Sequence, residues 1–344
     1  MSRIALVSFR LGGTDGVSIE AAKWVAALRR LGHHVTTVAG AGVADRLVRG
    51  LAADATSAPN RARLHEALGD CDVVIVENLA SLPLNVAARD VLYDVLEGRD
   101  AIFRHHDLAW QRAHLAHLEG PRDAPRWRHV TINELSRHEL LARGITSTTM
   151  YNSFDCDPPP GRRAFARDKL GVGPERLVAM PTRAIARKNV GGALELCARL
   201  GATLWLMGPA EDGYDDELAA LLRDARVEVR RMVPAGVTMD DAYAGADLVV
   251  MPSTWEGFGN PVLESVTHRR ALALHPYPVA REIIDFGFEF FDLDDVAGIE
   301  AFLRAPDDDL LASNLDVARR HFNLADLPAR LSRLLDGPLA GPDG

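Results

Sequence analysis

The sequence predicts an α/β protein made of two Rossmann-like domains in tandem. Short runs rich in β-branched residues alternate with stretches whose apolar residues recur at helical spacing, which is typical of βαβ units and parallel sheets. The alternation stops only once, at a proline-rich stretch near the middle of the chain. A length of 344 residues also favours two compact domains over one.

The first domain is predicted to span residues 1–155. Its first strand is expected at 3–9, and Ser18 is expected to cap a helix that ends at Gly32. Further strands are predicted at HVTTVAG, DVVIVEN, AIFRHH, HVTIN and ITSTTMY.

Residues 155–174 interrupt the pattern and are predicted to link the domains, because three consecutive prolines cannot lie inside a helix or a sheet. A second domain, 156–322, is then expected to contain the strands RLVAMPT, ATLWLMG, VEVRRMV, ADLVVMP, RALALH and FEFFD. The aspartates at 307–309 are expected at a helix N-terminus, where they suit the helix dipole. A last amphipathic helix, about 323–344, is expected to pack on either domain, including back on the first.

The composition argues against several classes of protein. A net charge of −9 argues against nucleic-acid binding, which depends on neutralising phosphates. The longest apolar runs have the length of a strand, and no signal-peptide pattern precedes the first strand, so a cytoplasmic protein without a membrane segment is expected. Three cysteines without C-x-x-C spacing argue against a disulfide framework or a structural zinc site.

The segment STWEGFGNPVLE, residues 253–264, carries the strongest functional signal. Asn260 followed by proline is typical of an N-cap and a first helical residue. Glu256 is therefore expected on a loop at the carboxyl end of a strand, where open α/β sheets bind ligands, and Glu264 in the first turn of the next helix. Glycines in the loop would let backbone N–H groups approach an anion, and Glu264 is placed to accept hydrogen bonds from a ribose diol. The segment predicts a nucleotide diphosphate site.

The same segment resembles the E-x7-E motif of retaining GT-B glycosyltransferases, in particular glycosyltransferase family 4. The resemblance implies a GT-B fold, in which two Rossmann-like domains with parallel sheets face across a cleft. It implies that Glu264 binds the nucleotide ribose and that Glu256 lies near the donor sugar. The residues between them would line the sugar and the diphosphate: Gly257, Phe258, Gly259 and Asn260.

Arg183 and Lys188, in RAIARKN, resemble the R-x4-K pair with which this family holds the donor diphosphate. An arginine fork and a lysine point charge complement each other on phosphate oxygens. In LGGTDG, Gly12 and Gly13 resemble a glycine-rich loop that closes over donor and acceptor, although a simple tight turn is the alternative.

In AIFRHHDLAW the predicted strand ends at two histidines, His105 and His106. Members of the family often carry a histidine at this position, where it contacts the donor sugar. His106 is the predicted contact, with His105 as its rival. YNSFD, residues 151–155, resembles the family's N-G-V-D turn and is interpreted as a hinge. The loop 107–128 is rich in arginine and tryptophan, and it either binds an anionic acceptor or is simply solvated. The chain departs from the family where His268, Arg269 and Arg270 replace small residues.

The predicted activity is transfer, with retention, of a sugar from a nucleotide diphosphate sugar of the GDP-mannose or UDP-glucose type to a hydroxyl of a small polar or glycan acceptor. The residues assigned to catalysis are His106, Arg183, Lys188 and Glu256. No metal or other cofactor is expected, because the Asp-x-Asp triplets at 70–72, 155–157 and 292–294 lie where turns and a helix cap are expected.

Two alternatives remain. One is a non-catalytic sugar-nucleotide-binding protein. The other is a Rossmann-type oxidoreductase. Two observations argue against it: LGGTDG lacks G-x-G-x-x-G spacing, and the second strand lacks the terminal acid that would hold an NAD ribose.

Overall fold

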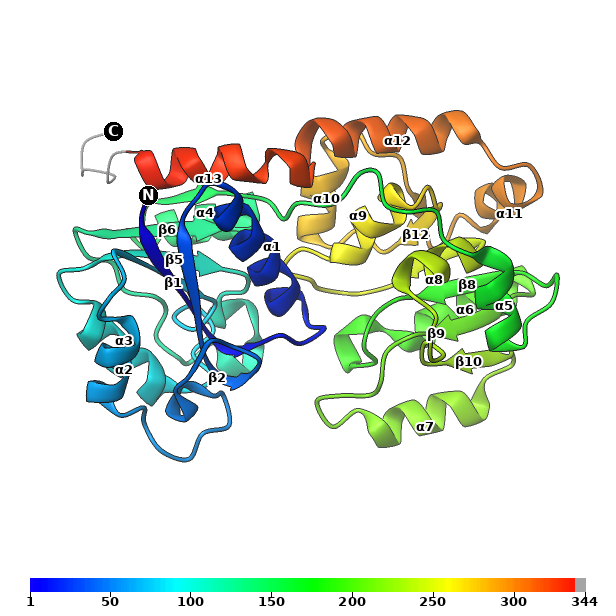
Figure 1. Ribbon diagram of the computed structural model, residues 1–344. Coiled ribbons are helices and arrows are strands. Elements are labelled where there is room, and N and C mark those ends of the chain that lie inside the picture. Colours follow the sequence, from blue (N-terminus) through cyan, green and yellow to red (C-terminus); the bar gives the residue numbers. More distant parts are fainter. Residues whose placement is uncertain (338–344) are drawn as a thin grey trace. The chain divides into compact units, whose positions relative to one another are not determined.

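A computed structural model describes residues 1–337, which form two compact units (Figure 1). Unit 1 comprises Met1–Ser153 together with the chain from Ala325 onward, and unit 2 comprises Phe154–Leu324. The chain therefore passes into unit 2 within the predicted hinge YNSFD and returns to unit 1 near its end. Among residues 1–337, no helix is both long and apolar enough to cross a bilayer. The part of the predicted last helix beyond 337 lies outside the described residues.

Unit 1 contains a seven-stranded parallel sheet in the order β3-β2-β1-β4-β5-β6-β7. Its strands are β1 (Arg3–Leu11), β2 (His34–Gly42), β3 (Arg46–Leu47), β4 (Val73–Glu77), β5 (Asp100–His105), β6 (Trp127–Thr131) and β7 (Ser147–Thr149). Its helices are α1 (Gly16–Arg30), α2 (Arg61–Leu68), α3 (Val86–Leu96), α4 (Glu134–Leu141) and α13 (Leu327–Asp336). The strand order reverses between β1 and β4, which is the kind of position at which open α/β sheets bind ligands.

Unit 2 contains a six-stranded parallel sheet in the order β10-β9-β8-β11-β12-β13. Its strands are β8 (Leu177–Met180), β9 (Thr203–Leu206), β10 (Val229–Arg231), β11 (Leu248–Met251), β12 (Leu272–Leu274) and β13 (Phe291–Asp292). Its helices are α5 (Arg163–Leu170), α6 (Val190–Leu200), α7 (Asp215–Asp224), α8 (Met239–Gly245), α9 (Asn260–Thr267), α10 (Pro278–Ile284), α11 (Val296–Arg304) and α12 (Asp308–His321). Here the order reverses between β8 and β11.

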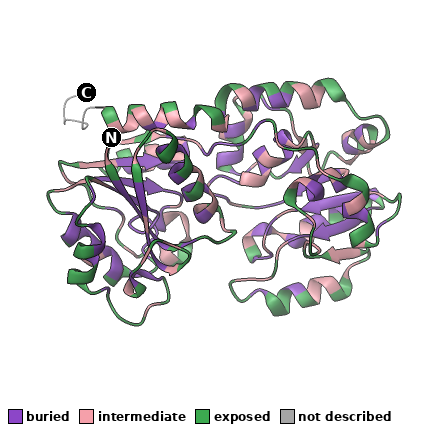
Figure 2. Ribbon diagram, in the orientation of Figure 1, coloured by how far each residue is buried: buried purple, intermediate pink, exposed green. Residues whose placement is uncertain are grey.

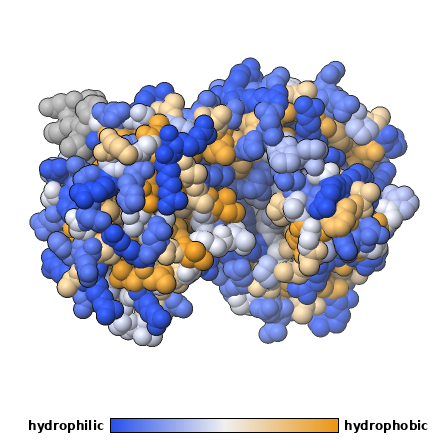
Figure 3. Space-filling view, in the orientation of Figure 1, coloured by the Kyte–Doolittle hydropathy of each residue, from blue (hydrophilic) through white to orange (hydrophobic). Residues whose placement is uncertain are grey.

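The loops of the described chain contain short 3-10 helices: η1 (Arg49–Leu51), η2 (Ala109–Gln111), η3 (Ala113–Leu115), η4 (Ala186–Lys188) and η5 (Leu324–Asp326). The predicted α/β class is confirmed. Figure 2 shows why the strands were recognisable, because they are buried between helices whose outer faces are exposed. Strands covered on both faces are nearly continuous apolar runs, as in β11. Polar and apolar residues are interspersed over the visible surface of each unit (Figure 3).

Two local expectations were wrong. The predicted linker contains α5, which packs on α8 and ends at Gly171 in the left-handed conformation. The N-cap of α1 is Asp15, whose carboxylate accepts from the backbone N–H and the hydroxyl of Ser18 at 3.0 and 2.8 Å. Ser18 therefore lies inside the first turn. By contrast, the acidic segment at 307–309 does begin α12, with Asp307 as N-cap.

Helix α13 packs within unit 1 against α1. Its Leu327 and Leu331 are each only 1% exposed. Arg128, next to the start of β6, donates from Nη1 to the carbonyls of Leu334 and Leu335 at 2.5 and 3.1 Å, which satisfies the free carbonyls at the end of α13.

Candidate functional site

The first group of candidate residues lies in unit 2, at the carboxyl ends of β8 and β11. The loop after β8 contains Arg183 and η4, and the loop after β11 leads into α9. The two loops are joined by a backbone bond, in which Thr254 donates to the Arg187 carbonyl at 2.9 Å. The switch point of the sheet thus brings RAIARKN against STWEGFGNPVLE.

Glu256 is buried and holds two cations. Arg187 donates from Nη1 to Oε2 of Glu256 at 2.6 Å, and Lys188 donates to Oε1. Burial acts to raise the pKa of Glu256, but Lys188 and Arg187 outweigh it and lower that pKa. Burial also lowers the pKa of Lys188, which Glu256 only partly offsets. The result is an ionised cluster in unit 2, in which two cations share one carboxylate and leave a net formal charge of +1.

The structure brings Lys188 to Glu256 but gives Arg183 a different partner. Arg183 is partly exposed and donates from Nη1 to Oε2 of Glu211 at 2.6 Å. The sequence prediction omitted Arg187, although this residue lies in the same RAIARKN segment. Its position directly beside Lys188 could have identified Arg187 as a candidate residue.

The glycine loop before α9 is closely fitted. Gly259 has a φ of 89°, and a Cβ there would lie 2.1 Å from the hydroxyl oxygen of Tyr277. That hydroxyl donates to the Phe258 carbonyl at 2.9 Å. The predicted N-cap was wrong by one residue, because Gly259 is the N-cap, Asn260 begins the helix and Pro261 is second. The left-handed turn at Gly259 is what starts α9 one residue early.

Glu264 is the fifth residue of α9 and not part of its first turn. Tyr243 of α8 donates its hydroxyl to Oε2 of Glu264 at 2.7 Å. Burial, together with the charge of Glu264, raises the pKa of Tyr243 well above its usual value, so the phenol remains a donor. His268 stacks on Tyr243 with ring centroids 4.5 Å apart and bonds to Asp240 at 2.9 Å. Tyr243 and His268 thus fix the surroundings of Glu264, and pattern analysis missed Tyr243 because it lies on a separate helix.

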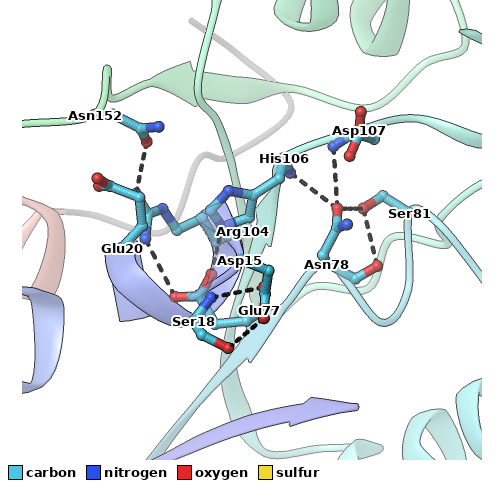
Figure 4. A network of polar contacts seen from close by, with 10 residues as sticks. All are labelled: Asp15, Ser18, Glu20, Glu77, Asn78, Ser81, Arg104, His106, Asp107 and Asn152. Atoms are coloured by element: carbon cyan, nitrogen blue, oxygen red, sulfur yellow. Dashed lines mark hydrogen bonds and ion pairs between the residues drawn. The ribbon is translucent and has the colours of Figure 1, made fainter. Parts of the chain in front are cut away.

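The second group lies in unit 1 and is drawn in Figure 4. Glu77, at the end of β4, is paired in register with Arg104 of β5. The carboxylate of Glu77 accepts a hydrogen bond from Nη1 of Arg104 at 3.3 Å and is hydrogen-bonded to Nε2 of His106 at 2.7 Å. Although burial acts to raise the pKa of Glu77, the charge of Arg104 and the bond with His106 hold that pKa below its usual value. Glu77 thus orients His106.

Arg104 connects this pair to the rest of the network. It is fully buried, contacts Oε2 of Glu20 at 3.2 Å and donates to Oδ1 of Asn152 at 3.0 Å. Its guanidinium lies 4.3 Å from the ring centroid of Trp24. Lys23 reaches the other oxygen of Glu20 at 2.5 Å. The buried charges are therefore balanced, as buried ions generally must be.

Asn78 holds the backbone at His106. Its φ is 60°, an unusual value for a residue other than glycine. In this conformation its Oδ1 accepts from the backbone N–H groups of His106 and Asp107 at 3.0 and 3.1 Å, and from the Ser81 hydroxyl at 3.1 Å (Figure 4).

His105 belongs to a different cluster on the other face of the sheet, as expected for neighbouring residues at the end of a strand. Its Nε2 bonds to Nδ1 of His129 at 2.9 Å, and Nε2 of His129 bonds to Asp123 at 3.2 Å. Burial, with the nearby charge of His129, lowers the pKa of His105 well below 6.5. The structure therefore places only His106 in the charged network.

The remaining predicted residues are placed as follows. A Cβ on Gly12, whose φ is 75°, would lie 2.7 Å from Cβ of Val43, so a tight turn alone accounts for this glycine. A Cβ on Gly13 would lie 2.9 Å from the carboxylate of Asp15. In the loop 107–128, ion pairs join Arg112 to Asp107, Arg122 to Glu119 and Arg126 to Asp100.

The Asp-x-Asp triplets are engaged in ion pairs and turns. Asp70 and Asp72 contact Arg46 and Arg3, and Asp157 contacts Arg319. The triplet at 292–294 does not cap the next helix, because the N-cap of α11 is Asp295. Across the described chain, no three His, Cys, Asp or Glu side chains are grouped as metal ligands.

Comparison with known proteins places these sites in context. Residues 183–315, which include Glu256 and Glu264, match the family described as Glycosyl transferases group 1. The mannosylglucosylglycerate synthase of Thermotoga maritima is 26% identical over 96% of this chain and 99% of its own length. Two solved structures are similar in fold, each covering 100% of its own chain. They are HepE from Anabaena in complex with UDP-glucose (TM-score 0.74, 16% identity, 98% of this chain) and WaaG, a glycosyltransferase involved in lipopolysaccharide biosynthesis (TM-score 0.69, 15% identity, 97% of this chain).

The two parallel-sheet units therefore have the GT-B architecture. With the match over residues 183–315, the comparisons support a glycosyltransferase that uses a nucleotide-sugar donor.

Proposed function

We propose that this chain, whose residues 183–315 match group 1 of the glycosyl transferases, moves a hexosyl group with retention from a nucleoside diphosphate sugar to a hydroxyl of a small polar acceptor. The observation that carries the proposal is the cluster in which Arg187 and Lys188 hold the buried Glu256 between the ends of β8 and β11. It sets fixed positive charge at the edge of the sheet where α/β proteins bind ligands.

The diphosphate is proposed to lie between Arg183, Lys188 and the start of α9. Arg183 is partly exposed, so exchanging its bond with Glu211 for bonds with phosphate oxygens costs little desolvation. The left-handed turn at Gly259 starts α9 at the carboxyl edge of the sheet, and the N-terminus of a helix favours a negatively charged group. Glu264, held from one side by Tyr243, is proposed to accept hydrogen bonds from the ribose hydroxyls.

The donor and the acceptor are proposed from the relatives. The name of the Thermotoga maritima relative describes a product containing mannose, glucose and glycerate. This name favours a GDP-mannose or UDP-glucose type of donor and an acceptor that carries a carboxylate. An anionic acceptor also agrees with the arginine-rich loop 107–128 of unit 1.

The proposed mechanism is front-face attack, in which the departing diphosphate accepts the proton of the acceptor hydroxyl. Both oxygens of Glu256 are engaged by cations, so this carboxylate is poorly placed to act as a nucleophile. Arg183 and Lys188 would stabilise the negative charge that develops on the leaving diphosphate, with no metal ion required. His106, whose Nε2 bonds with the ionised Glu77, is proposed to present its remaining ring edge to the donor sugar.

The test is a donor panel of GDP-mannose, UDP-glucose, UDP-galactose and ADP-glucose, each with glucosylglycerate, glycerate and glucose as acceptors. Mass spectrometry detects the products, and the anomeric coupling constant in NMR reports their configuration. An α-linked product formed in the presence of EDTA is expected. A β-linked product would refute retention, and activity lost in EDTA but restored by Mn²⁺ or Mg²⁺ would refute metal independence. Nucleotide binding with neither transfer nor slow donor hydrolysis would instead indicate a binding protein.

A further inference from the structure

Unit 2 contains a cavity at the edge of its sheet opposite to the Glu256 loop. The cavity has a volume of about 550 Å³, within the range typical of small-molecule sites. Its lining includes Arg176, Asp247 and Arg270, which precede β8, β11 and β12 respectively, whereas the candidate donor residues follow β8 and β11. The strands are parallel, so these residues lie at the amino ends of the strands and form a separate site. Figure 1 shows α5 and α11, which contribute to the walls, at the same end of unit 2.

The lining is cationic in a protein that is acidic overall. It contains four arginines and two aspartates, a formal charge of +2, while the whole chain carries −9. Asp247 already has three partners. Arg163 and Arg167 form ion pairs with its carboxylate at 2.5 and 3.3 Å, and the Leu177 N–H donates to it at 2.8 Å. Little of its charge is left for the other arginines.

Arg270 is the least compensated of these arginines. Its Nε is buried, and no hydrogen-bond acceptor reaches it in the described part of the chain. Burial and the neighbouring charge of Arg163 lower the pKa of Arg270, and Asp247 opposes this only in part. A partly buried cation without an adequate counter-ion is costly, and an anion in the cavity would remove that cost.

Arg269 gives a second, independent observation. It follows α9 with a φ of 52°, and its N–H donates to the Val266 carbonyl at 2.9 Å. The next N–H, of Arg270, donates to Ser265 at 2.8 Å. This is the helix-ending position that glycine usually occupies, because a Cβ is unfavourable there. The chain nevertheless has an exposed arginine at this point, beside the cavity.

One wall of the cavity is apolar and contains Phe302, Leu303 and Leu311. An arginine group opposite an apolar wall suits a ligand with an oxyanion at one end and a carbon body at the other. Guanidinium groups match phosphate oxygens with paired hydrogen bonds. We infer that this cavity binds a phosphorylated small molecule, separately from the nucleotide-sugar site and whether or not the proposed transferase activity is correct.

The test measures binding of glucose 6-phosphate, glycerol 3-phosphate and 3-phosphoglycerate by calorimetry, with glucose and inorganic phosphate for comparison. Five proteins are compared: the parent, Arg270→Gln, Arg269→Gly, Arg183→Ala and the control Arg223→Ala. At least one phosphomonoester is expected to bind the parent more tightly than either glucose or phosphate. Its affinity should fall about tenfold or more in Arg270→Gln and in Arg269→Gly, since each loses a charge-assisted contact. Arg183→Ala should bind like the parent.

Arg269→Gly guards against a folding artefact, because removing the Cβ at a left-handed position should keep or raise the melting temperature while binding is lost. Arg223→Ala, on the exposed face of α7 and outside the cavity, is the matched control and should bind normally. The inference is overturned if no phosphomonoester distinguishes the parent from the Arg269 and Arg270 variants. It is also overturned if Arg183→Ala abolishes the binding, which would place the ligand at the donor site.

Discussion

The buried histidine pair of unit 1 predicts a measurable loss of stability in mild acid. His105 is 1% exposed, and burial together with His129 keeps its pKa well below 6.5. In the unfolded chain the imidazole regains an ordinary pKa and takes up a proton below pH 6.5, which the folded protein does not. Protonation therefore favours unfolding. The destabilisation due to His105 is absent above about pH 6.5 and grows as the pH falls. At pH 5.5, one unit below the unfolded pKa, His105 should lower the free energy of unfolding of unit 1 by roughly 1 kcal/mol.

The perturbation is His105→Gln, which keeps a polar group near Nδ1 of His129 but cannot titrate. Hydrogen exchange of β5 and β6 peptides, corrected for the intrinsic rates, reports the opening of unit 1 alone. Between pH 7.5 and 5.5 the opening free energy of the parent should fall more than that of the variant, by roughly 1 kcal/mol. His34→Gln, at an exposed position, is the matched control and should keep the parent slope. Equal slopes for His105→Gln and the parent would refute the reasoning.

Three further predictions concern unit 2. Glu264→Ala should weaken binding of the nucleoside diphosphate at least tenfold by calorimetry, because each lost charge-assisted bond is worth roughly 1.5–3 kcal/mol; equal affinity would exclude the ribose assignment. Arg183→Ala should lower turnover more than donor affinity, with little change in melting temperature. Lys188→Ala should also lower the melting temperature of unit 2, because the buried Glu256 loses one of its two cationic partners and keeps only Arg187. Comparable melting temperatures for these two variants would contradict the buried pairing. Gly259→Ala should abolish donor binding and destabilise the loop before α9, because its Cβ would lie 2.1 Å from the Tyr277 hydroxyl oxygen; normal binding would show that the turn can relax.

Much of the fold followed from local sequence. Apart from the two-residue β3, which was not predicted, the strands of both sheets were recognisable because parallel strands are buried on both faces and appear as apolar runs, such as LVVM in β11. The acidic start of α12 was also a local signal. Helix α5 was missed because it has only eight residues and directly follows three prolines. Its stability comes from packing on α8, which no local pattern displays.

The site residues, like the elements of the fold, were predicted where the signal was local in the sequence and missed where it was not. Glu256, Gly259 and Glu264 were found because one short segment contains all three. Glu20 and Glu77 were not found, since each meets Arg104 only after the sheet has formed and they are 57 positions apart in the sequence. The choice between His105 and His106 likewise depended on which face of the sheet holds a counter-ion.

The return of the chain to unit 1 has a consequence for synthesis. A ribosome delivers β1 to β7 first, then all of unit 2, and α13 last. Until α13 emerges, the face of α1 against which α13 packs is uncovered, and Arg128 lacks the carbonyls to which it donates. Unit 1 can therefore complete its structure only after translation of unit 2 has finished. A premature stop codon near position 325 would release an intact unit 2 attached to an incomplete unit 1, a species that quality-control proteases should recognise by its exposed α1 surface.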